Sequence, residues 1–181
     1  MSDFKIIIIF IFSIIVVSCN DDDTSIIDTN AMTEDLIGTW NLTEESQNGR
    51  VTTELIVGIP VSGTVTSVGK NLNTQFIFNE NPNIYEASGG YTDVIKIAVA
   101  GQTLAEGDLE VPISSLINQG SWSLNQGVLT LSHNGIEQTV NIIELTTISL
   151  IIELDIEEDN ITYQGFTGDI ESTIKMTFEK Q

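Results

Sequence analysis

The sequence predicts an all-β protein, an antiparallel up-and-down barrel of about 8–10 strands that follows a cleaved signal peptide. Three observations support this prediction. From residue 36 onward, apolar residues recur with period two and Thr, Ile, Val and Leu are frequent, as in strands with one buried face. Short turn signals such as Asn134-Gly135 separate these alternating runs. Near the start of the chain, residues 6–17 form an apolar segment, and the chain's one cysteine follows it closely.

The first eighteen residues are typical of a secretory signal. A short polar start with Asp3 and Lys5 precedes the apolar segment 6–17, which only Ser13 interrupts. As a helix this segment would span about 18 Å, which is short of the roughly 30 Å hydrocarbon core of a membrane. Its length suits the apolar centre of a signal peptide, which has about 7–15 residues.

The residues around the cysteine indicate a lipid anchor. Val16-Val17-Ser18-Cys19 resembles the lipobox of bacterial lipoproteins. The resemblance implies that residues 1–18 are removed and that Cys19 carries acyl chains such as palmitate. Two or three acyl chains hold a protein at a membrane almost permanently. We therefore expect the membrane as a partner through this N-terminal anchor, with the chain not spanning it.

An acidic run follows the cysteine directly: Asn20, Asp21, Asp22 and Asp23. Such a run resembles the surface-export signal of some Gram-negative lipoproteins, and it also suits a solvated tether, because like charges repel. The two interpretations are compatible. Residues 19–35 are thus predicted to be an acidic flexible tether. The expected location is the outer membrane, lipid-anchored and at the cell surface, with the inner face of that membrane as the alternative.

Composition limits the partners of the remaining domain, residues 36–181. The chain has a net charge of −20. Five basic residues follow the signal peptide and are scattered singly: Arg50, Lys70, Lys96, Lys175 and Lys180. Nucleic acids and anionic head groups are recognised by clustered basic residues, so we expect neither as a partner. No cysteine follows the anchor, and the fold therefore depends on packing and hydrogen bonds without disulfides.

The alternation places most strands, with some boundaries less clear. Leu36–Thr43 and Val51–Val57 are predicted to form a hairpin around Asn48-Gly49. Residues 58–72 alternate weakly, and the segment 107–119, which contains Pro112, is predicted to hold a turn of helix that closes one end of the sheet. The later strands are predicted at residues 73–79, 83–89, 91–100, 120–124, 128–133, 136–145, 147–155, 161–167 and 171–179.

Two tryptophan motifs carry a family resemblance over roughly residues 36–179. Gly38-Thr39-Trp40 heads the first strand, as in the G-x-W signature of lipocalins. Gly120-Ser121-Trp122-Ser123-Leu124, followed closely by 127–131, is similar to a second block of the small bacterial lipocalin-like domain family. The resemblance implies a lipocalin-like barrel with an apolar cup. Lipocalins usually set an arginine of the last strand over the first tryptophan, and here only Lys175 and Lys180 are available.

No residue pattern indicates catalysis, a cofactor or a metal. His133 is the only histidine, which excludes zinc sites built on His and Cys, and the nucleophile elbow G-x-S-x-G does not occur. The cluster Asp155, Glu157, Glu158, Asp159 and Asn160 fails the EF-hand spacing and is predicted to be a solvated hairpin turn. Paired carboxylates for glycoside cleavage depend on a three-dimensional separation that the sequence does not specify.

Two functions fit these observations, neither of them enzymatic. One is a lipoprotein that binds a small apolar ligand in the barrel. The other is a structural or interaction module with a filled barrel and no ligand. A cavity of about 300 Å³ or more would favour the first function, and a packed interior would favour the second.

We predict that Cys19→Ser releases the protein from membranes, because the acyl chains attach through this thiol. The measurement is fractionation of cells followed by a carbonate wash, with the wild-type chain as reference. A variant that stays with the washed membranes would contradict the lipid anchor.

Overall fold

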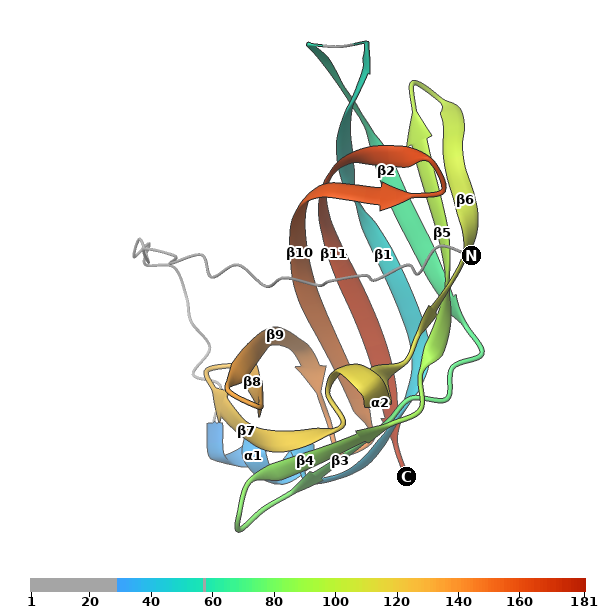
Figure 1. Ribbon diagram of the computed structural model, residues 1–181. Coiled ribbons are helices and arrows are strands. Elements are labelled where there is room, and N and C mark those ends of the chain that lie inside the picture. Colours follow the sequence, from blue (N-terminus) through green and yellow to red (C-terminus); the bar gives the residue numbers. More distant parts are fainter. Residues whose placement is uncertain (1–28, 57) are drawn as a thin grey trace.

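The computed structural model describes residues 29–56 and 58–181 (Figure 1). The predicted signal peptide, Cys19 and the acidic run from Asn20 to Asp23 lie outside the described residues. In chain order the elements are α1 (Thr29–Leu36), β1 (Gly38–Ile56), β2 (Ile59–Lys70), β3 (Gln75–Asn79), β4 (Ile84–Ser88), β5 (Tyr91–Val99), β6 (Gln102–Val111), α2 (Ile113–Leu116), β7 (Gln119–Asn125), β8 (Val128–His133), β9 (Ile136–Leu145), β10 (Ser149–Tyr163) and β11 (Phe166–Lys180).

Eight antiparallel strands close into a barrel. Their order is β1, β3, β4, β7, β8, β9, β10 and β11, and β11 pairs again with β1. Apart from the insertion of β2, β5 and β6, neighbours in the barrel follow one another along the chain. The predicted all-β, up-and-down barrel is therefore confirmed. Because the barrel is closed, each of these eight strands pairs with a neighbour on both sides over at least part of its length.

The strands β2, β5 and β6 extend the sheet beyond the barrel. The start of β1 pairs with β3, whereas its later part, from Ser46 to Ile56, pairs with β2. Because β10, β11 and β1 are long, their far halves continue past the barrel and form a second curved sheet with these three strands (Figure 1). The end of the β10–β11 hairpin curls over this sheet, and Tyr163 and Gln164 lie against Gly107 of β6.

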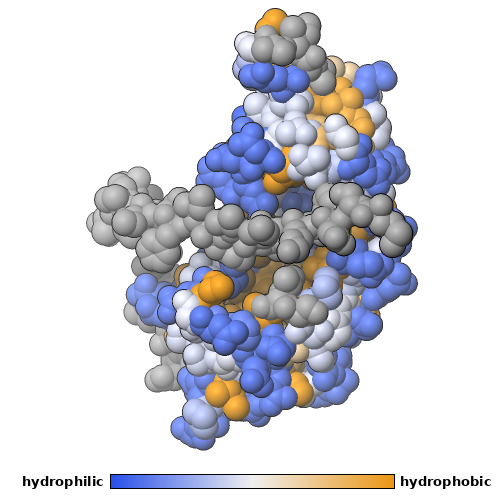
Figure 2. All heavy atoms as spheres, viewed as in Figure 1, coloured by the Kyte–Doolittle hydropathy of each residue, from blue (hydrophilic) through white to orange (hydrophobic). Residues whose placement is uncertain are grey.

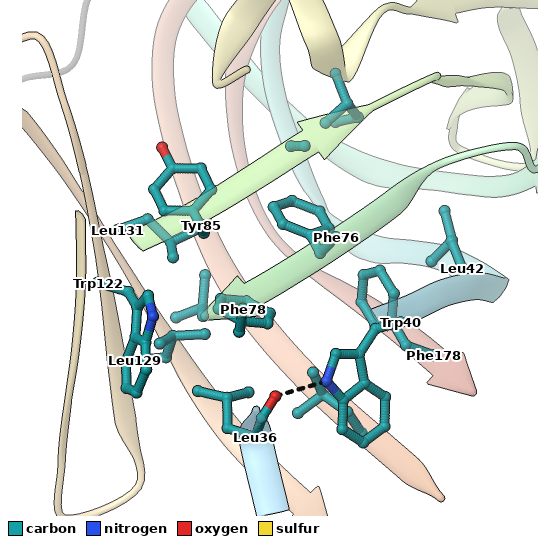
Figure 3. Close-up of a cluster of buried hydrophobic side chains, with 14 of the residues drawn as sticks. Leu36, Trp40, Leu42, Phe76, Phe78, Tyr85, Trp122, Leu129, Leu131 and Phe178 are labelled. Carbon is teal, nitrogen blue, oxygen red and sulfur yellow. Dashed lines mark hydrogen bonds between the residues drawn. The ribbon is translucent and has the colours of Figure 1, made fainter. Parts of the chain in front are cut away.

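Each half of the molecule has its own apolar core. The barrel core is rich in aromatic rings (Figure 3). Its buried members are Leu36, Trp40, Leu42, Phe76, Phe78, Tyr85, Ala87, Tyr91, Ile113, Trp122, Leu129, Leu131, Val140, Leu150 and Phe178. The core of the second sheet is smaller and comprises Val51, Val65, Ile97, Val99, Ala105 and Phe166.

Trp40 and Trp122, the two tryptophans of the family motifs, are part of the barrel core. Trp40 is completely buried, and its Nε1 donates a hydrogen bond to the carbonyl oxygen of Leu36 at 2.8 Å (Figure 3). Trp122 packs edge-on against Phe78 with ring centroids 6.1 Å apart, and its Nε1 donates to the carbonyl oxygen of Asn79 at 2.9 Å. Each indole thus buries its apolar ring while its one polar atom is satisfied.

Lys180 occupies the position that an arginine takes in most lipocalins. Its Nζ lies 5.1 Å from the centroid of the Trp40 ring and donates a hydrogen bond to the carbonyl oxygen of Asp35 at 2.7 Å. The stem of Lys180 runs beside Gly38. A cation over an indole face is attracted by the ring's negative surface. The closing contact of the barrel is therefore present, with lysine in place of arginine.

The other motif glycine, Gly120, permits a close approach of β7 to its neighbours. A Cβ at this position would collide with the carbonyl oxygen of Ser132 and would lie 2.9 Å from a ring carbon of Tyr85. Only glycine leaves room for this packing, which explains its place two residues before Trp122.

One predicted hairpin is present and the other is wrong. Asn134 and Gly135 have φ values of 51° and 80° and form the turn between β8 and β9, as predicted. Asn48 and Gly49 lie instead in the middle of β1, where Gly49 pairs with Ser172 of β11 and with Val65 of β2. Partners on both sides keep the chain extended, so tertiary pairing overrides the local turn preference.

The sequence also misplaced the last hairpin. Residues 147–155 and 161–167 were predicted as two strands, but β10 runs from Ser149 to Tyr163 and the turn falls at Gln164-Gly165, both with positive φ. The acidic cluster is therefore part of a strand and not a hairpin turn. At Asn160 (φ 56°) the strand is irregular, and its amide donates to Asp169 Oδ1 at 2.9 Å.

Three other segments refine the predicted boundaries. β6 begins at Gln102 in a region that was not predicted as a strand, and α2 is the predicted turn of helix within 107–119. Residues 29–35, which were assigned to the tether, form most of α1. The physical reason is Leu36, which ends this helix and is completely buried in the barrel core.

We predict that Trp40→Ala lowers the free energy of unfolding by roughly 3–5 kcal/mol, because it removes a fully buried aromatic side chain. Trp40→Phe keeps most of the apolar volume and loses the hydrogen bond to Leu36, so its loss is expected to be smaller. Urea unfolding followed by circular dichroism gives both values. Equal unfolding midpoints for Trp40→Ala and the parent would contradict this role of Trp40.

Candidate functional site

The barrel itself is packed solid. The pocket between its inward side chains has a volume of only about 20 Å³, which is room for about one water molecule and not for a ligand. Phe76, Phe78 and Phe178 are among the side chains that fill it. The apolar cup implied by the lipocalin resemblance is therefore not inside the barrel.

A larger cavity lies beyond the barrel, on the concave face of the second sheet. Its volume is about 540 Å³, within the range of roughly 300–1,000 Å³ that is usual for small-molecule sites. Most of the wall is apolar, and β10 closes it with residues 156–163. The apolar lining includes Val65, Ile95, Ile97, Leu109, Ile170 and Ile174. On the face shown in Figure 2, hydrophilic residues surround smaller apolar patches.

A buried polar layer separates the barrel core from this cavity. It contains two carboxyl groups, since Glu45 of β1 is 3% exposed and Asp93 of β5 is 5% exposed. Gln47, beside them, donates from Nε2 to Ser172 Oγ at 2.7 Å and accepts at Oε1 from Ser67 Oγ at 3.4 Å. Gln47 and Asp93 both contribute to the cavity wall. The polar layer is thus the floor of the cavity.

The space for Glu45 is created by a glycine on the next strand. A Cβ on Gly69 of β2 would lie 2.8 Å from the Cβ of Glu45 and 3.1 Å from its Oε2. Gly69 also pairs with Asp93 across β2 and β5. A larger residue at position 69 would displace the carboxyl group.

The two carboxyl groups have strongly perturbed protonation. Burial, and after it the negative charge of Asp93, raises the pKa of Glu45 from its ordinary 4.5 to about 8. Burial also raises the pKa of Asp93, although the Ser67 hydroxyl partly opposes that rise. At neutral pH the pair therefore retains a proton. Such a pair of coupled, buried carboxyls is typical of functional sites.

The hydrogen-bonding capacity of this pair is largely unused. Apart from the proton shared within the pair, the Gly69 amide and the Ser67 hydroxyl, no described group pairs with either oxygen of Glu45 or with Asp93 Oδ1. Buried polar atoms of proteins are nearly always paired, and leaving one unpaired costs about 1–3 kcal/mol. These oxygens have almost no accessible surface, and Asp93 is the carboxyl residue of the pair that reaches the cavity wall.

Of the residues considered for chemistry on the basis of the sequence, only part of the acidic cluster reaches the cavity. His133 is half-buried at the end of β8, and its ring contacts the carbonyl oxygen of Gln119. Asp155 and Glu157 point outward from β10, whereas Glu158 and Asp159 line the cavity. Within residues 29–56 and 58–181, no group of three or more His, Cys, Asp or Glu side chains could hold a metal ion.

Glu45 and Asp93 were not predicted from the sequence as site residues. The alternation could have indicated Asp93, because this residue lies on the same, inward face of its strand as Ile95, Ile97 and Val99. Glu45 had no such signal. Up to Leu42, the even-numbered residues of β1 point inward. An irregularity between Leu42 and Glu44 changes this, so that odd-numbered residues, beginning with Glu45, point inward from there on.

The fold and this cavity define a small antiparallel barrel of the type that binds small molecules. The profile of the lipocalin-like domain family matches residues 36–152. The chain belongs to the lipocalin-like domain family. No curated protein and no solved structure matches it significantly. Neither helix of the described part of the chain is long and apolar enough to cross a membrane.

We predict that the protein loses stability between pH 5 and pH 8 and that Glu45→Gln abolishes most of this loss. Between its ordinary pKa of 4.5 and its raised pKa of about 8, folded Glu45 holds a proton that the unfolded chain has released. Stability should then fall by up to about 1.4 kcal/mol per pH unit for one such proton.

The measurement is urea unfolding at several pH values. Glu44→Gln is the matched control, since Glu44 is the exposed neighbour and its removal should leave the slope unchanged. An unchanged slope in Glu45→Gln would mean that Glu45 ionises normally in the folded protein.

Proposed function

We propose that this protein is a lipid-anchored outer-membrane lipoprotein that binds a small, largely apolar molecule without catalysing a reaction. The observation that carries the proposal is the cavity of about 540 Å³ on the concave face of the second sheet. Its apolar wall would exclude water from a ligand, and its few polar groups would orient the ligand. The solid barrel below it would serve as a rigid support.

The filled barrel favours a second candidate function, an interaction module without a ligand. A barrel with only about 20 Å³ of free space stabilises the fold and leaves its outer face for contacts. This candidate does not account for the large cavity or for the unpaired carboxyl groups in its floor. Ligand binding accounts for both.

Location at the outer membrane rests on the sequence of residues 1–23. The apolar segment 6–17, Cys19 and the run from Asn20 to Asp23 support export, lipid attachment and display at the cell surface, in that order. In the folded domain, α1 begins at Thr29 and leads directly into β1 at the barrel end. The anchor would thus be attached to the end of the molecule that holds Trp40.

We predict that Ile95→Trp weakens the binding of decanol by about tenfold or more, because the larger ring fills part of the cavity. Ile95 lines the cavity and is half-buried, so an indole there projects into the free space. Isothermal titration calorimetry of the full chain with decanol gives the dissociation constants.

Ile143→Trp is the control for this substitution. Ile143 lies on β9 of the barrel and is 52% exposed, so a tryptophan there should not change decanol binding. If both variants bind decanol as the parent does, the cavity is not the binding site. Native mass spectrometry of protein from its own host would show whether a natural ligand is retained.

A further inference from the structure

The charge of the cavity limits which ligands it can hold. Its lining includes Asp93, Glu158 and Asp159, and Glu45 lies behind Asp93. No Lys, Arg or His is among the described residues that line it. An anionic head group such as a carboxylate or a phosphate would have no counter-charge here and would face like charges. The ligand is therefore neutral or positively charged.

The unpaired oxygens in the floor distinguish between these two cases. Asp93 is nearly completely buried, forms part of the cavity wall and has one oxygen without a partner among the described residues. Glu45 adds two more unpaired oxygens directly behind it. The one proton that the pair retains at neutral pH satisfies only part of these oxygens, so the group that matches the rest is a hydrogen-bond donor. A protonated amine has three donors and the complementary charge.

We propose that the cavity binds a small cationic amphiphile, an apolar molecule whose protonated amine lies against Asp93 in the floor, with Glu45 behind it. This inference rests on the proposed ligand-binding function and specifies the chemical class of the ligand. The apolar body contacts the isoleucine-rich wall of β5, β10 and β11. The ammonium group hydrogen-bonds to the Asp93 carboxyl group, which forms part of the cavity wall, and its charge also favours the ionised form of Glu45 behind it.

Binding of the amine is coupled to release of a proton from the carboxyl pair. An alkylamine has a pKa near that of lysine, about 10.4, and enters the cavity charged. Its charge stabilises the ionised form of both carboxyls, so the proton that raises the pKa of Glu45 leaves to the solvent. Affinity for the amine should therefore increase as the pH rises from 6 toward 8.

The other titratable groups that face the pair do not reverse this expectation. Tyr91, on the same strand as Asp93, has its pKa raised by burial and then by the two carboxyls, so it remains neutral. Tyr163 on β10 also has a raised pKa, mainly from burial. Glu158 on β10 has its pKa raised by burial and becomes more negative as the pH rises, which acts in the same direction. Asp159 and Asp108 are the remaining acids, from β10 and β6.

The experiment compares decylamine, decanol and decanoate, which share one apolar chain and differ in head-group charge. Isothermal titration calorimetry of the full chain at pH 7 measures each dissociation constant. We expect decylamine to bind about tenfold or more tightly than decanol and decanoate to bind more weakly than both. In Asp93→Asn the ratio of the decylamine and decanol affinities should approach one, whereas Glu44→Gln should keep the wild-type ratio.

A second measurement needs no variant. Titration of decylamine in two buffers of different ionisation enthalpy should detect up to one proton released per amine bound, and none for decanol. Equal affinities for decylamine and decanol, with no proton release, would overturn the amine inference and leave ligand binding intact. Failure of all three probes to bind would overturn both.

Discussion

The antiparallel ladder between β1 and β11 belongs to both halves of the molecule, and both the barrel and the second sheet depend on it. It runs from the pair Trp40–Lys180 to the pair Thr52–Asp169. At one end this ladder closes the barrel, in the lower part of Figure 1, and at the other end it forms the centre of the second sheet, in the upper part. A shift of one residue would turn every side chain of β1 to the opposite face. One register therefore places Lys180 over Trp40 and Glu45 beneath the cavity.

A single irregularity in this ladder creates the polar floor. Between Leu42 and Glu44 the inward face of β1 changes from even-numbered to odd-numbered residues. Without the shift, Glu44 would face inward and Glu45 would be exposed to solvent. With it, Glu45 and then Gln47 lie between the two apolar cores, and Val51 enters the second core. Bulges often redirect side chains beside functional sites, and here the redirected residue is a carboxyl whose pKa rises to about 8.

Much of the barrel could be predicted from the sequence because its signals are local. Period-two alternation identified most strands, and Asn134-Gly135 identified a true hairpin. Asn48-Gly49 was interpreted as a hairpin turn, because the pairing with β11 and β2 that keeps these residues extended is not visible in the sequence. The Glu45–Asp93 pair could not be predicted from the sequence, because it depends on tertiary structure. It forms because β2 pairs with β1 on one side and with β5 on the other, and Gly69 leaves the space between them.

The match to the lipocalin-like domain family covers most strands of the barrel but only part of the cavity. The matched residues end at 152, within the first part of β10. The cavity also requires residues 156–163 of β10 and Ile170 and Ile174 of β11, which lie beyond that match. The tryptophan motifs support the solid half of the molecule, whereas the cavity is formed by long strand ends and by the inserted strands β2, β5 and β6. The proposed ligand specificity therefore depends on features that the motifs do not encode, above all the length of the β10–β11 hairpin and the carboxyl pair under it.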